Sequence, residues 1–484
     1  MRLILPMILP VVAALAIWLL PRGKRALENA YMLAALIVSA LFALLCAFRG
    51  EESLTLWQLT DKIAIVLKTD GLARFYLVFI SIVWVMVGIY STAYNAHDAH
   101  ARRFNCFYLA TYGVLMGLSM SANAVTMYMF YEMMTLITLP LVMHTMEKEA
   151  VAAGIKYLVY SVFGASAALL GIFFLMHYGT TLSFTPGGVL DMAKVAGNEN
   201  LLRAIVFVML LGFSVKAGMF PMHAWLPTAH PVAPAPASAV LSGVITKMGV
   251  LGVIRVLFYL VGPEFIRGSW VQNAFMALTL ITVFMGSLLA LREKALKKRL
   301  AYSSVSQVSY ILFGLSTLSP LGFIGALLHI VSHSFIKNTL FMSAGAIIHE
   351  TGKTRADELT GIGRVMPRVM VVFTIVSLGL IGIPPTGGFI SKWYLAEGAL
   401  SLNSTASWIG PAVLLCSALM TAGYLLTITI HGFFPGESAA VEGHEAPKAM
   451  WIPMLVLAVL SVLAGLFPNM LIGFIQTIIS AIFA

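Results

Sequence analysis

Residues 201–230 read LLRAIVFVMLLGFSVKAGMFPMHAWLPTAH. The run is long and apolar enough to cross a bilayer, for which a helix needs about 20 residues. It nevertheless contains Lys216, which is followed closely by Gly218 and Pro221. Proline removes a backbone hydrogen-bond donor and clashes with the preceding turn. The stretch therefore predicts a membrane helix that breaks near Pro221, with a lysine beside the break.

A second interrupted run lies further along the chain. Residues 382–392 read GIPPTGGFISK, so Pro384 and Pro385 predict another break, and Lys392 follows it. The two breaks lie five predicted spans apart. Because an odd number of spans reverses the orientation of a unit, this spacing predicts two inverted five-helix repeats, with the breaks in spans 7 and 12.

The composition indicates a membrane protein throughout. Of the 484 residues, 60% are hydrophobic and 10% are charged, against roughly 25% charged residues in soluble domains. We predict an all-α integral membrane protein of about 14 transmembrane helices. The predicted spans are residues 2–20, 30–48, 72–94, 104–122, 124–144, 155–178, 201–230, 236–260, 271–291, 301–318, 321–348, 368–402, 409–432 and 450–467. Residues 468–484 extend the last span or lie at the interface, and the mixed stretch 49–71 is predicted to be a surface loop.

These spans divide the chain into four predicted segments. They are an N-terminal three-helix segment (1–103), a first repeat of spans 4–8 (104–260), a second, inverted repeat of spans 9–13 (261–432), and a C-terminal span (433–484).

The net charge of +10 is interpreted as a sign of topology, and no nucleic-acid partner is expected. Basic residues gather in the short loops after spans 1, 3, 9 and 11, which all fall on one side. The positive-inside rule assigns that side to the cytoplasm and both termini to the outside. The residues are Arg22, Lys24, Arg25, Arg102, Arg103, Arg292, Lys294, Lys297, Lys298, Arg299, Lys353, Arg355, Arg364 and Arg368.

The first run, Leu3 to Leu20, has no small-residue cleavage site and is followed by basic residues, so we interpret it as a retained helix rather than a signal peptide. Cys46, Cys106 and Cys416 are scattered without C-x-x-C spacing. This pattern argues against an iron–sulfur or structural zinc site in the chain. If electron transfer is involved, we expect it in another subunit.

Seven ionisable residues are predicted at membrane depth, where a charge costs about 2.5–3.5 kcal/mol on insertion scales. Such residues are functional by default, and together they can form a hydrated line of titratable groups that passes protons. A carboxylate such as Glu132 can then control whether Lys216 holds a proton. The predicted proton-transfer residues are Glu132, Lys216, Lys247, His329, His333, Lys337 and Lys392, of which the three in span 11 recur every fourth residue and share a helical face.

Other interpretations stay open for several of these side chains. A single buried charge can be paired, or can extend toward the interface. His329 and His333 have the spacing of a metal-ligand pair, but no third ligand is near them in sequence, so no metal site is predicted. His223 and His230 either line a path by which protons enter or cap the interface. Arg255 is interpreted as an interfacial anchor or a partner-helix contact.

The segment from Phe213 to His230, continued through residues 233–238 to Lys247, resembles the proton-conducting membrane transporter family. That family comprises the antiporter-like subunits of respiratory complex I, of membrane-bound hydrogenases and formate hydrogenlyases, and of multi-subunit Mrp Na+/H+ antiporters. The resemblance covers essentially all of the predicted spans. It implies the family's fold of two inverted repeats with discontinuous spans 7 and 12, and it matches the family's key glutamate to Glu132 and its lysines and histidines to the other six positions.

Within the family, the chain looks most like an antiporter D-type subunit or its counterpart in an energy-converting hydrogenase. Lys392 occupies a position that is usually glutamate in M-type subunits of complex I. The long lateral helix of L-type subunits and the large extension of the antiporter A-type subunit have no counterpart in the sequence.

The resemblance implies a proton-translocating subunit of a multi-subunit complex, either a Mrp-type Na+/H+ antiporter or a redox-driven pump like a hydrogenase or complex I. The alternative is a membrane subunit that energises bicarbonate or CO2 uptake, and a purely structural anchor would have no use for so many buried titratable groups. No cofactor is expected in the chain, and any oxidoreductase activity would reside in partner subunits. The expected partners are other integral membrane subunits and the lipids of a bacterial or archaeal cytoplasmic membrane.

The transported ion is expected to be H+ rather than Na+ in this chain. Sodium sites prefer oxygen ligands, and the predicted spans contain few carboxylates. Glu132 is the clear one, and Glu397 is a second candidate near the end of span 12.

Overall fold

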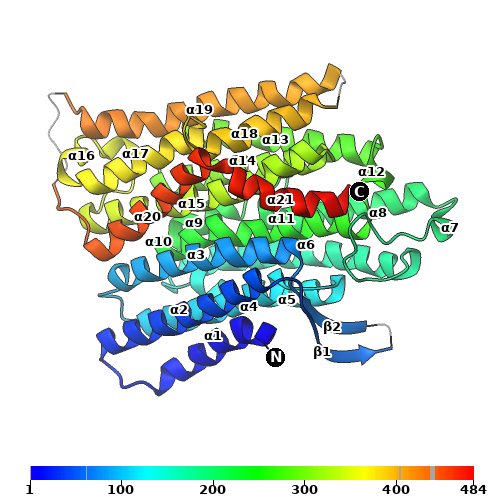
Figure 1. Cartoon of the computed structure of the whole chain (residues 1–484). Coiled ribbons are helices and arrows are strands. Elements are labelled where there is room, and N and C mark those ends of the chain that lie inside the picture. Colours follow the sequence, from blue (N-terminus) through cyan, green and yellow to red (C-terminus); the bar gives the residue numbers. More distant parts are fainter. Residues whose placement is uncertain (1, 62, 403–404, 437–441, 484) are drawn as a thin grey trace.

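The computed structural model describes residues 2–61, 63–402, 405–436 and 442–483. The long helices lie side by side, and most run roughly parallel to one another (Figure 1). Eleven helical segments among the described residues are long and apolar enough to cross a membrane. Three further predicted spans correspond to α4, α14 and the broken pair α17–α18, which fall short of that measure in composition or length.

The first part of the chain forms six long helices. They are α1 (Leu5–Ala16), which short turns η1 (Arg2–Ile4) and η2 (Ile17–Leu19) extend, α2 (Arg25–Arg49), α3 (Gly71–Tyr94), α4 (Ala101–Ser119), α5 (Ala124–Val142) and α6 (Lys148–Tyr178). Asp70 caps the start of α3 by accepting a hydrogen bond from the Ala73 amide, and Asn123 caps α5 in the same way through the Thr126 amide. Such caps satisfy backbone donors that the first helical turn leaves unpaired.

The prediction of a surface loop at residues 49–71 is wrong, because this stretch contains a β-hairpin within an otherwise helical fold. β1 (Ser53–Thr60) pairs antiparallel with β2 (Ile63–Lys68). Ile65 and Leu67 alternate along β2 and are buried, because side chains two residues apart share a face of a strand. The Val66 amide donates to the Thr126 hydroxyl at 3.0 Å, which attaches the hairpin to the start of α5.

Both predicted breaks coincide with helix ends. α8 (Glu199–Ala217) is followed by Gly218 at φ +78° before α9 (Leu226–Val232) begins, and α17 (Pro367–Ile381) is followed by Gly382 at φ +95° before α18 (Gly387–Leu400) begins. Glycine adopts positive φ without steric cost, so it ends a helix, and the prolines that follow prevent its continuation.

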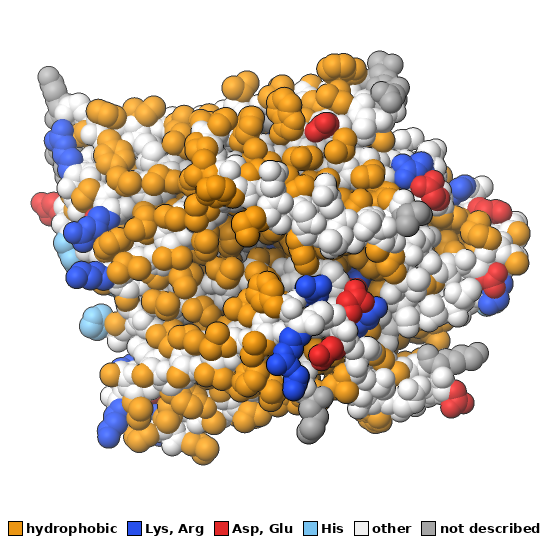
Figure 2. All heavy atoms as spheres, viewed as in Figure 1, with side chains coloured by type: hydrophobic (Ala, Val, Ile, Leu, Met, Phe, Trp, Pro, Cys, Tyr) orange, Lys and Arg blue, Asp and Glu red, His pale blue; other side chains and the backbone are white. Residues whose placement is uncertain are grey.

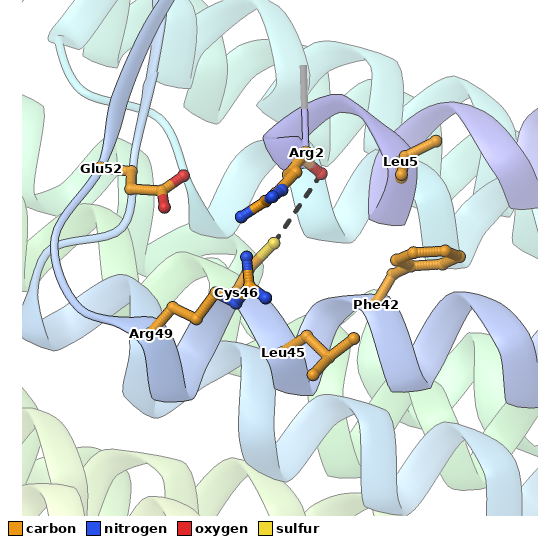
Figure 3. Close-up of a pocket in the computed structure, with 7 residues that line it drawn as sticks. All are labelled: Arg2, Leu5, Phe42, Leu45, Cys46, Arg49 and Glu52. Carbon is orange, nitrogen blue, oxygen red and sulfur yellow. Dashed lines mark hydrogen bonds between the residues drawn. The ribbon is translucent and has the colours of Figure 1, made fainter.

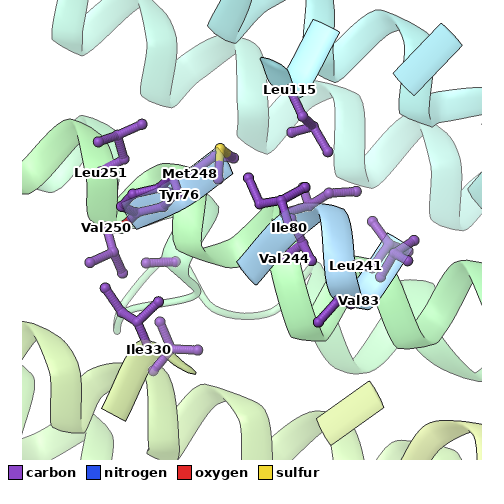
Figure 4. Packing of buried hydrophobic residues seen from close by; sticks show 14 of the residues in the cluster. Tyr76, Ile80, Val83, Leu115, Leu241, Val244, Met248, Val250, Leu251 and Ile330 are labelled. Atoms are coloured by element: carbon purple, nitrogen blue, oxygen red, sulfur yellow. The ribbon is translucent and has the colours of Figure 1, made fainter. Parts of the chain in front are cut away.

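The centre of the fold is the segment between residues 235 and 260 together with α15 (Pro320–Thr351). The segment consists of α10 (Ala235–Val240), the π-helical turn η3 (Leu241–Ile245), α11 (Thr246–Arg255) and a second π-helical turn η4 (Val256–Leu260), and its most apolar stretch is wholly buried. Figure 4 shows Val244 and Met248 of this segment beside Tyr76 and Ile80 of α3, with Ile330 of α15 close to Val250. Elements this buried need neighbours on every side, so polar residues placed in them are shielded from lipid.

The remaining helices complete the bundle. They are α7 (Met192–Val195), α12 (Pro263–Ile266), α13 (Trp270–Arg292), α14 (Leu296–Ser316), η5 (Ala356–Glu358), α16 (Ile362–Val365), η6 (Thr405–Trp408), α19 (Ile409–Phe433), α20 (Lys448–Leu466) and α21 (Pro468–Ile482). The stretch after Pro468 is thus a separate helix, whose isoleucines at 472, 475, 478 and 482 are buried. α21 contacts α3, α15 and α20, so it packs against the bundle.

The outer surface is largely apolar. Hydrophobic side chains cover the middle of the face in Figure 2, while basic and acidic side chains gather toward its two ends and in one group beside the N-terminal helices. Large apolar residues stand almost fully exposed, including Leu19 at 87% and Leu419 at 75%. Such a surface is stable only when hydrocarbon covers it, because apolar area exposed to water is costly.

Candidate functional site

Lys216 lies in the last turn of α8, and its side chain is enclosed by three hydroxyl groups. Its ammonium group donates to Thr135 of α5 at 2.9 Å and, on α6, to Tyr157 at 2.9 Å and Ser161 at 2.8 Å. The side chain is 1% exposed and also lies 4.4 Å from the centre of the Tyr157 ring. We call Thr135, Tyr157 and Ser161 the hydroxyl cage. All of its members are neutral acceptors, so they can solvate the ammonium group without fixing its charge.

Glu132 lies one turn before Thr135 on α5. It is only partly buried, and Met133 and Leu136 beside it are exposed, at 42% and 59%. Its carboxylate makes no hydrogen bond or ion pair with any residue that the structure describes, although it is close enough to Lys216 for electrostatic interaction. We call the row of ionisable residues from Glu132 to Lys392 the buried line. Glu132 lies at its outward-facing edge and not in its core.

Lys247 is fully buried on α11, next to the π-helical turn η3. Its ammonium group donates to the Ser242 carbonyl at 2.5 Å. A π-turn shifts the backbone hydrogen bonds by one residue, and such turns are frequent at functional sites because they free backbone groups for other partners. Gly249 packs α11 directly against α8, so that an added Cβ would lie 3.1 Å from the Cβ of Lys216. The two lysines therefore occupy adjacent, tightly packed helices.

Ser242 of η3 and two residues of α14 lie between Lys247 and Lys337. Lys247 donates to the carbonyl of Ser242, and the hydroxyl of the same residue contacts α14. The Ser242 and Ser304 hydroxyls are 2.6 Å apart, and the Ser304 hydroxyl donates to the Leu300 carbonyl at 2.9 Å. Lys337 on α15 donates to that same carbonyl at 3.1 Å.

Lys337 is linked to α19 through Ser303. It also donates to the Ser303 hydroxyl at 2.8 Å, and Ser303 in turn lies 2.6 Å from the Tyr424 hydroxyl. Four helices thus meet around these two lysines, and neither lysine has a carboxylate partner among the described residues.

His333 and His329 extend the line along α15. Their rings stack at a centroid distance of 5.7 Å, and His329 also stacks on Tyr310 at 5.6 Å. The Nδ1 atom of His329 lies 2.9 Å from the Ser391 hydroxyl on α18. Because Ser391 directly precedes Lys392, the histidine pair reaches the second helix break.

Lys392 folds back from α18 onto the end of α17. Its ammonium group donates to the carbonyls of Leu380 at 2.6 Å and Ile381 at 2.9 Å, and it lies 5.1 Å from the centre of the Tyr310 ring. The last carbonyls of a helix carry the negative end of the helix dipole, which favours a cation. The break therefore provides the acceptor site for this lysine.

His230 and His223 lie in different surroundings, although both follow the first break. His230 is fully buried on α9 and stacks on Phe341 of α15 at 4.5 Å, and neither ring nitrogen has a hydrogen-bond partner among the described residues. His223 is partly buried between α8 and α9. Lys156 of α6, which is not conspicuous in the sequence, donates to Thr228 of α9 at 3.0 Å.

Several polar atoms along this line are buried without a partner in the described structure. They are both ring nitrogens of His230 and His333, Nε2 of His329, both amide atoms of Gln307, Oδ1 of Asn338 and the Ser214 hydroxyl. Buried polar atoms are almost always hydrogen-bonded to protein or ordered water. Their concentration here distinguishes this region from an ordinary packed core.

The structure also shows the surroundings of Arg255 and Glu397, two further charged residues that the sequence analysis considered. Arg255 is 1% exposed and forms a two-bond ion pair, at 2.5 and 2.9 Å, with Asp70, which caps the start of α3, so the partner-helix interpretation holds. Glu397 is exposed on α18, away from the buried line.

The hydroxyl groups around the lysines were missed from the sequence, although a signal was present. Tyr157 and Ser161 share one face of an otherwise apolar span, and residues 302–309 read YSSVSQVS, an unusually polar run for a buried helix. Hydroxyls at helical spacing in a membrane helix indicate contacts to polar groups on neighbouring helices.

Residues 121–421 match the family described as NADH:quinone oxidoreductase/Mrp antiporter, TM. The chain belongs to this family. The matched range contains the two helix breaks and every residue of the buried line. Family membership, together with the helices and the apolar surface, makes the chain a multi-pass integral membrane protein.

Relatives in this family align over nearly the whole chain. The N-type subunit of the NADH-quinone oxidoreductase of Desulforudis audaxviator is 31% identical, over 97% of this chain and 96% of its own. The D-type subunit of the Na(+)/H(+) antiporter of Bacillus subtilis is 27% identical, over 96% and 93%. The family resemblance inferred from the sequence is therefore confirmed.

Solved structures show the same fold. A chain of the Mrp complex from Dietzia sp. DQ12-45-1b superposes with a TM-score of 0.84 at 21% identity, covering 98% of this chain and 96% of that one. A chain of an archaeal membrane-bound sulfane sulfur reductase superposes with a TM-score of 0.87 at 22% identity, covering 100% and 98%. Both structures are multi-subunit membrane complexes.

Proposed function

We propose that the chain is a proton-translocating, antiporter-like subunit of a multi-subunit membrane complex, and that protons move along the buried line from Glu132 to Lys392. The observation that carries the proposal is the way in which the lysines are held. Within the described residues, Lys216, Lys247, Lys337 and Lys392 donate only to hydroxyls and backbone carbonyls. A structural buried cation is normally paired with a carboxylate, as Arg255 is with Asp70.

The neutral partners leave both protonation states open to each lysine. A hydroxyl or carbonyl accepts from the charged form, and hydroxyls can also donate to the neutral amine. Between Lys337 and Lys392 the histidines supply ring nitrogens that can accept and donate protons. The buried polar atoms without partners provide places where water can complete a relay.

The finer architecture is also part of the proposal. We infer 14 spans, with segment 1–103 preceding the repeats 104–260 and 261–432 and segment 433–484 following them. Each helix break has a lysine beside it. Lys216 lies in the last turn of α8, and Lys392 donates to the end of α17, so the two breaks resemble each other and support two inverted repeats. Arg25 donates to the Asp98 carbonyl and Lys294 pairs with Asp357, which brings the basic loops together in pairs and supports one cytoplasmic side with both termini outside.

The partners are inferred from the site and the relatives. Glu132 is a carboxylate on an outward-facing surface of exposed apolar residues, where lipid is a poor environment for it. A neighbouring membrane subunit that covers this surface would supply a polar partner. Relatives occur in an NADH-quinone oxidoreductase and in a Na(+)/H(+) antiporter, so the energy source, redox chemistry or an ion gradient, is set by the partner subunits.

The test is proton transport by the complex that contains a Lys216→Ala variant. In inverted membrane vesicles energised by the complex's own driving reaction, formation of a ΔpH is expected to be abolished while the chain remains inserted and assembled. Lys194→Ala is the matched control, because Lys194 forms a surface ion pair with Asp191 far from the line. Normal transport by Lys216→Ala would overturn the proposal, and co-purifying iron–sulfur or nickel–iron subunits would identify the complex as redox-driven.

A further inference from the structure

A cavity of about 260 Å³ lies between the start of α1 and the end of α2. Its lining consists of Arg2, Leu5, Phe42, Leu45, Cys46, Arg49 and Glu52. Figure 3 shows both arginine side chains directed toward the space above Cys46, with Glu52 on the far side and Leu5, Phe42 and Leu45 along the helices. The cavity is remote from the buried lysine line and has no part in the proposed proton path.

The charged rim of the cavity is not neutralised within the described part of the chain. Arg2 and Arg49 are exposed, and neither guanidinium group makes a hydrogen bond or an ion pair with any residue in the described ranges. The Cys46 thiol lies 3.8 Å from the Arg2 carbonyl, which holds the start of α1 against α2 and keeps the two arginines at the same level. Two guanidinium groups against one carboxylate leave one net positive charge.

The floor of the cavity is apolar and continues along the two helices. Leu5 and Leu45 are exposed, at 38% and 53%. Below them, Ile8 and Val12 of α1 and Leu41 of α2 are also exposed. These residues recur at helical spacing on the outward face of each helix. A cationic rim above an apolar groove is complementary to a phospholipid, whose anionic headgroup lies at the membrane surface and whose acyl chains lie below it.

We propose that this cavity binds one anionic glycerophospholipid, whose phosphate lies between Arg2 and Arg49 and whose acyl chain follows the groove between α1 and α2. Guanidinium groups bind phosphate oxygens through paired, charge-assisted hydrogen bonds. The single net positive charge of the rim matches the single negative charge of a phosphodiester. Glu52 accepts a hydrogen bond from a hydroxyl of the headgroup, which favours phosphatidylglycerol over headgroups that lack a donor.

The experiment measures lipid retained by the purified complex in mild detergent, by native mass spectrometry after addition of phosphatidylglycerol, phosphatidylethanolamine or phosphatidylcholine. Each of Arg2→Gln and Arg49→Gln is expected to weaken phosphatidylglycerol binding about fivefold. Arg22→Gln is the matched control, because Arg22 is an exposed arginine in the turn at the other ends of the same two helices. Equal retention of the three lipids by the wild-type complex, or unchanged retention in the double arginine variant, would overturn the proposal.

A second variant tests the groove without touching the charges. Leu45→Trp fills the space along α2 and is expected to reduce phosphatidylglycerol binding while leaving the assembly of the complex unchanged. Inorganic phosphate at millimolar concentration is expected not to displace the lipid. Displacement by phosphate alone would make the rim a simple anion site, and cross-linking of a photoreactive residue at position 45 to a neighbouring protein rather than to lipid would make it a protein contact. Either result would overturn the proposal.

Discussion

Gly164 of α6 and Gly212 of α8 pack backbone against backbone. A Cβ added to Gly164 would lie 2.6 Å from the Gly212 carbonyl oxygen, and one added to Gly212 would lie 2.5 Å from the Gly164 carbonyl oxygen. Ser161 and Tyr157 lie one and two turns earlier on α6, where they hold Lys216 of α8. The absence of two side chains therefore sets the distance across which the hydroxyl cage reaches the lysine.

Gly164→Ala is expected to push α6 away from α8 and to loosen the cage. Overpacking of this kind costs about 1–3 kcal/mol, so thermal stability in detergent should fall and proton transport should drop several-fold. Gly473→Ala is the matched control, because no atom lies within 4 Å of a Cβ added there. An unchanged melting temperature and transport rate in Gly164→Ala would show that the contact does not position the cage.

Glu132→Gln is expected to abolish transport without affecting insertion. The substitution keeps the shape of the side chain and removes the carboxylate whose charge acts on Lys216. ΔpH formation in inverted vesicles provides the measurement, with Glu147→Gln, at an exposed position just before α6, as the control. Retained activity would mean that another carboxylate, within the chain or on a partner, controls the lysine.

Lys392→Ala is expected to slow transport strongly at the far end of the line. It removes the cation that donates to the carbonyls of Leu380 and Ile381, so the half-helix α17 loses the group that offsets its dipole. The exposed Lys353→Ala variant serves as the control. A wild-type ΔpH in vesicles carrying Lys392→Ala would exclude this role.

His144→Gln is expected to reduce the acid sensitivity of the folded state. Burial lowers the pKa of His144, in the connection after α5, although its hydrogen bond to Asp98 at 2.5 Å opposes this shift. The unfolded chain then binds a proton at this histidine at a higher pH than the folded chain does, so stability declines as the pH falls below about 6.5.

The pKa of Asp98, the hydrogen-bond partner of His144, is also shifted in a direction that makes the folded state less stable in acid. Partial burial would raise the pKa of Asp98, but hydrogen bonds from His100 and His144 outweigh it and lower the pKa, so stability is also lost when Asp98 is protonated at more acidic pH. Melting temperatures of the wild type and of His144→Gln at pH 7.5 and pH 5.5 separate the two groups. Equal losses in both proteins would contradict the role of His144.

Sequence periodicity predicted most of the fold but not the hairpin. Long apolar runs require helices, because a lipid-exposed backbone must satisfy its own hydrogen bonds. Residues 53–68 were not predicted to form strands because they lie outside the long apolar runs, and their pairing depends on contacts with the start of α5. The two breaks were predictable since glycine and proline act locally.

The buried line was predicted by residue type, and its connections were not. Lysines and histidines in apolar spans stand out in any sequence because they are costly there. Their partners, such as Ser303 for Lys337 and Ser391 for His329, are common residues that can be recognised as partners only from the packing of neighbouring helices. For the same reason Arg255 could not be assigned to Asp70, which is 185 residues away in the chain.

By itself, the sequence determined that the protein lies in a membrane, where its helices break and which ionisable groups lie in its apolar runs, because each of these depends on local composition. Only the tertiary structure decided that the lysines are held by neutral hydroxyls and carbonyls, that Glu132 faces outward and that Arg2 and Arg49 line the same cavity. These relationships join segments distant in the chain, and their geometry is set by which side chains, or which glycines, allow two helices to approach.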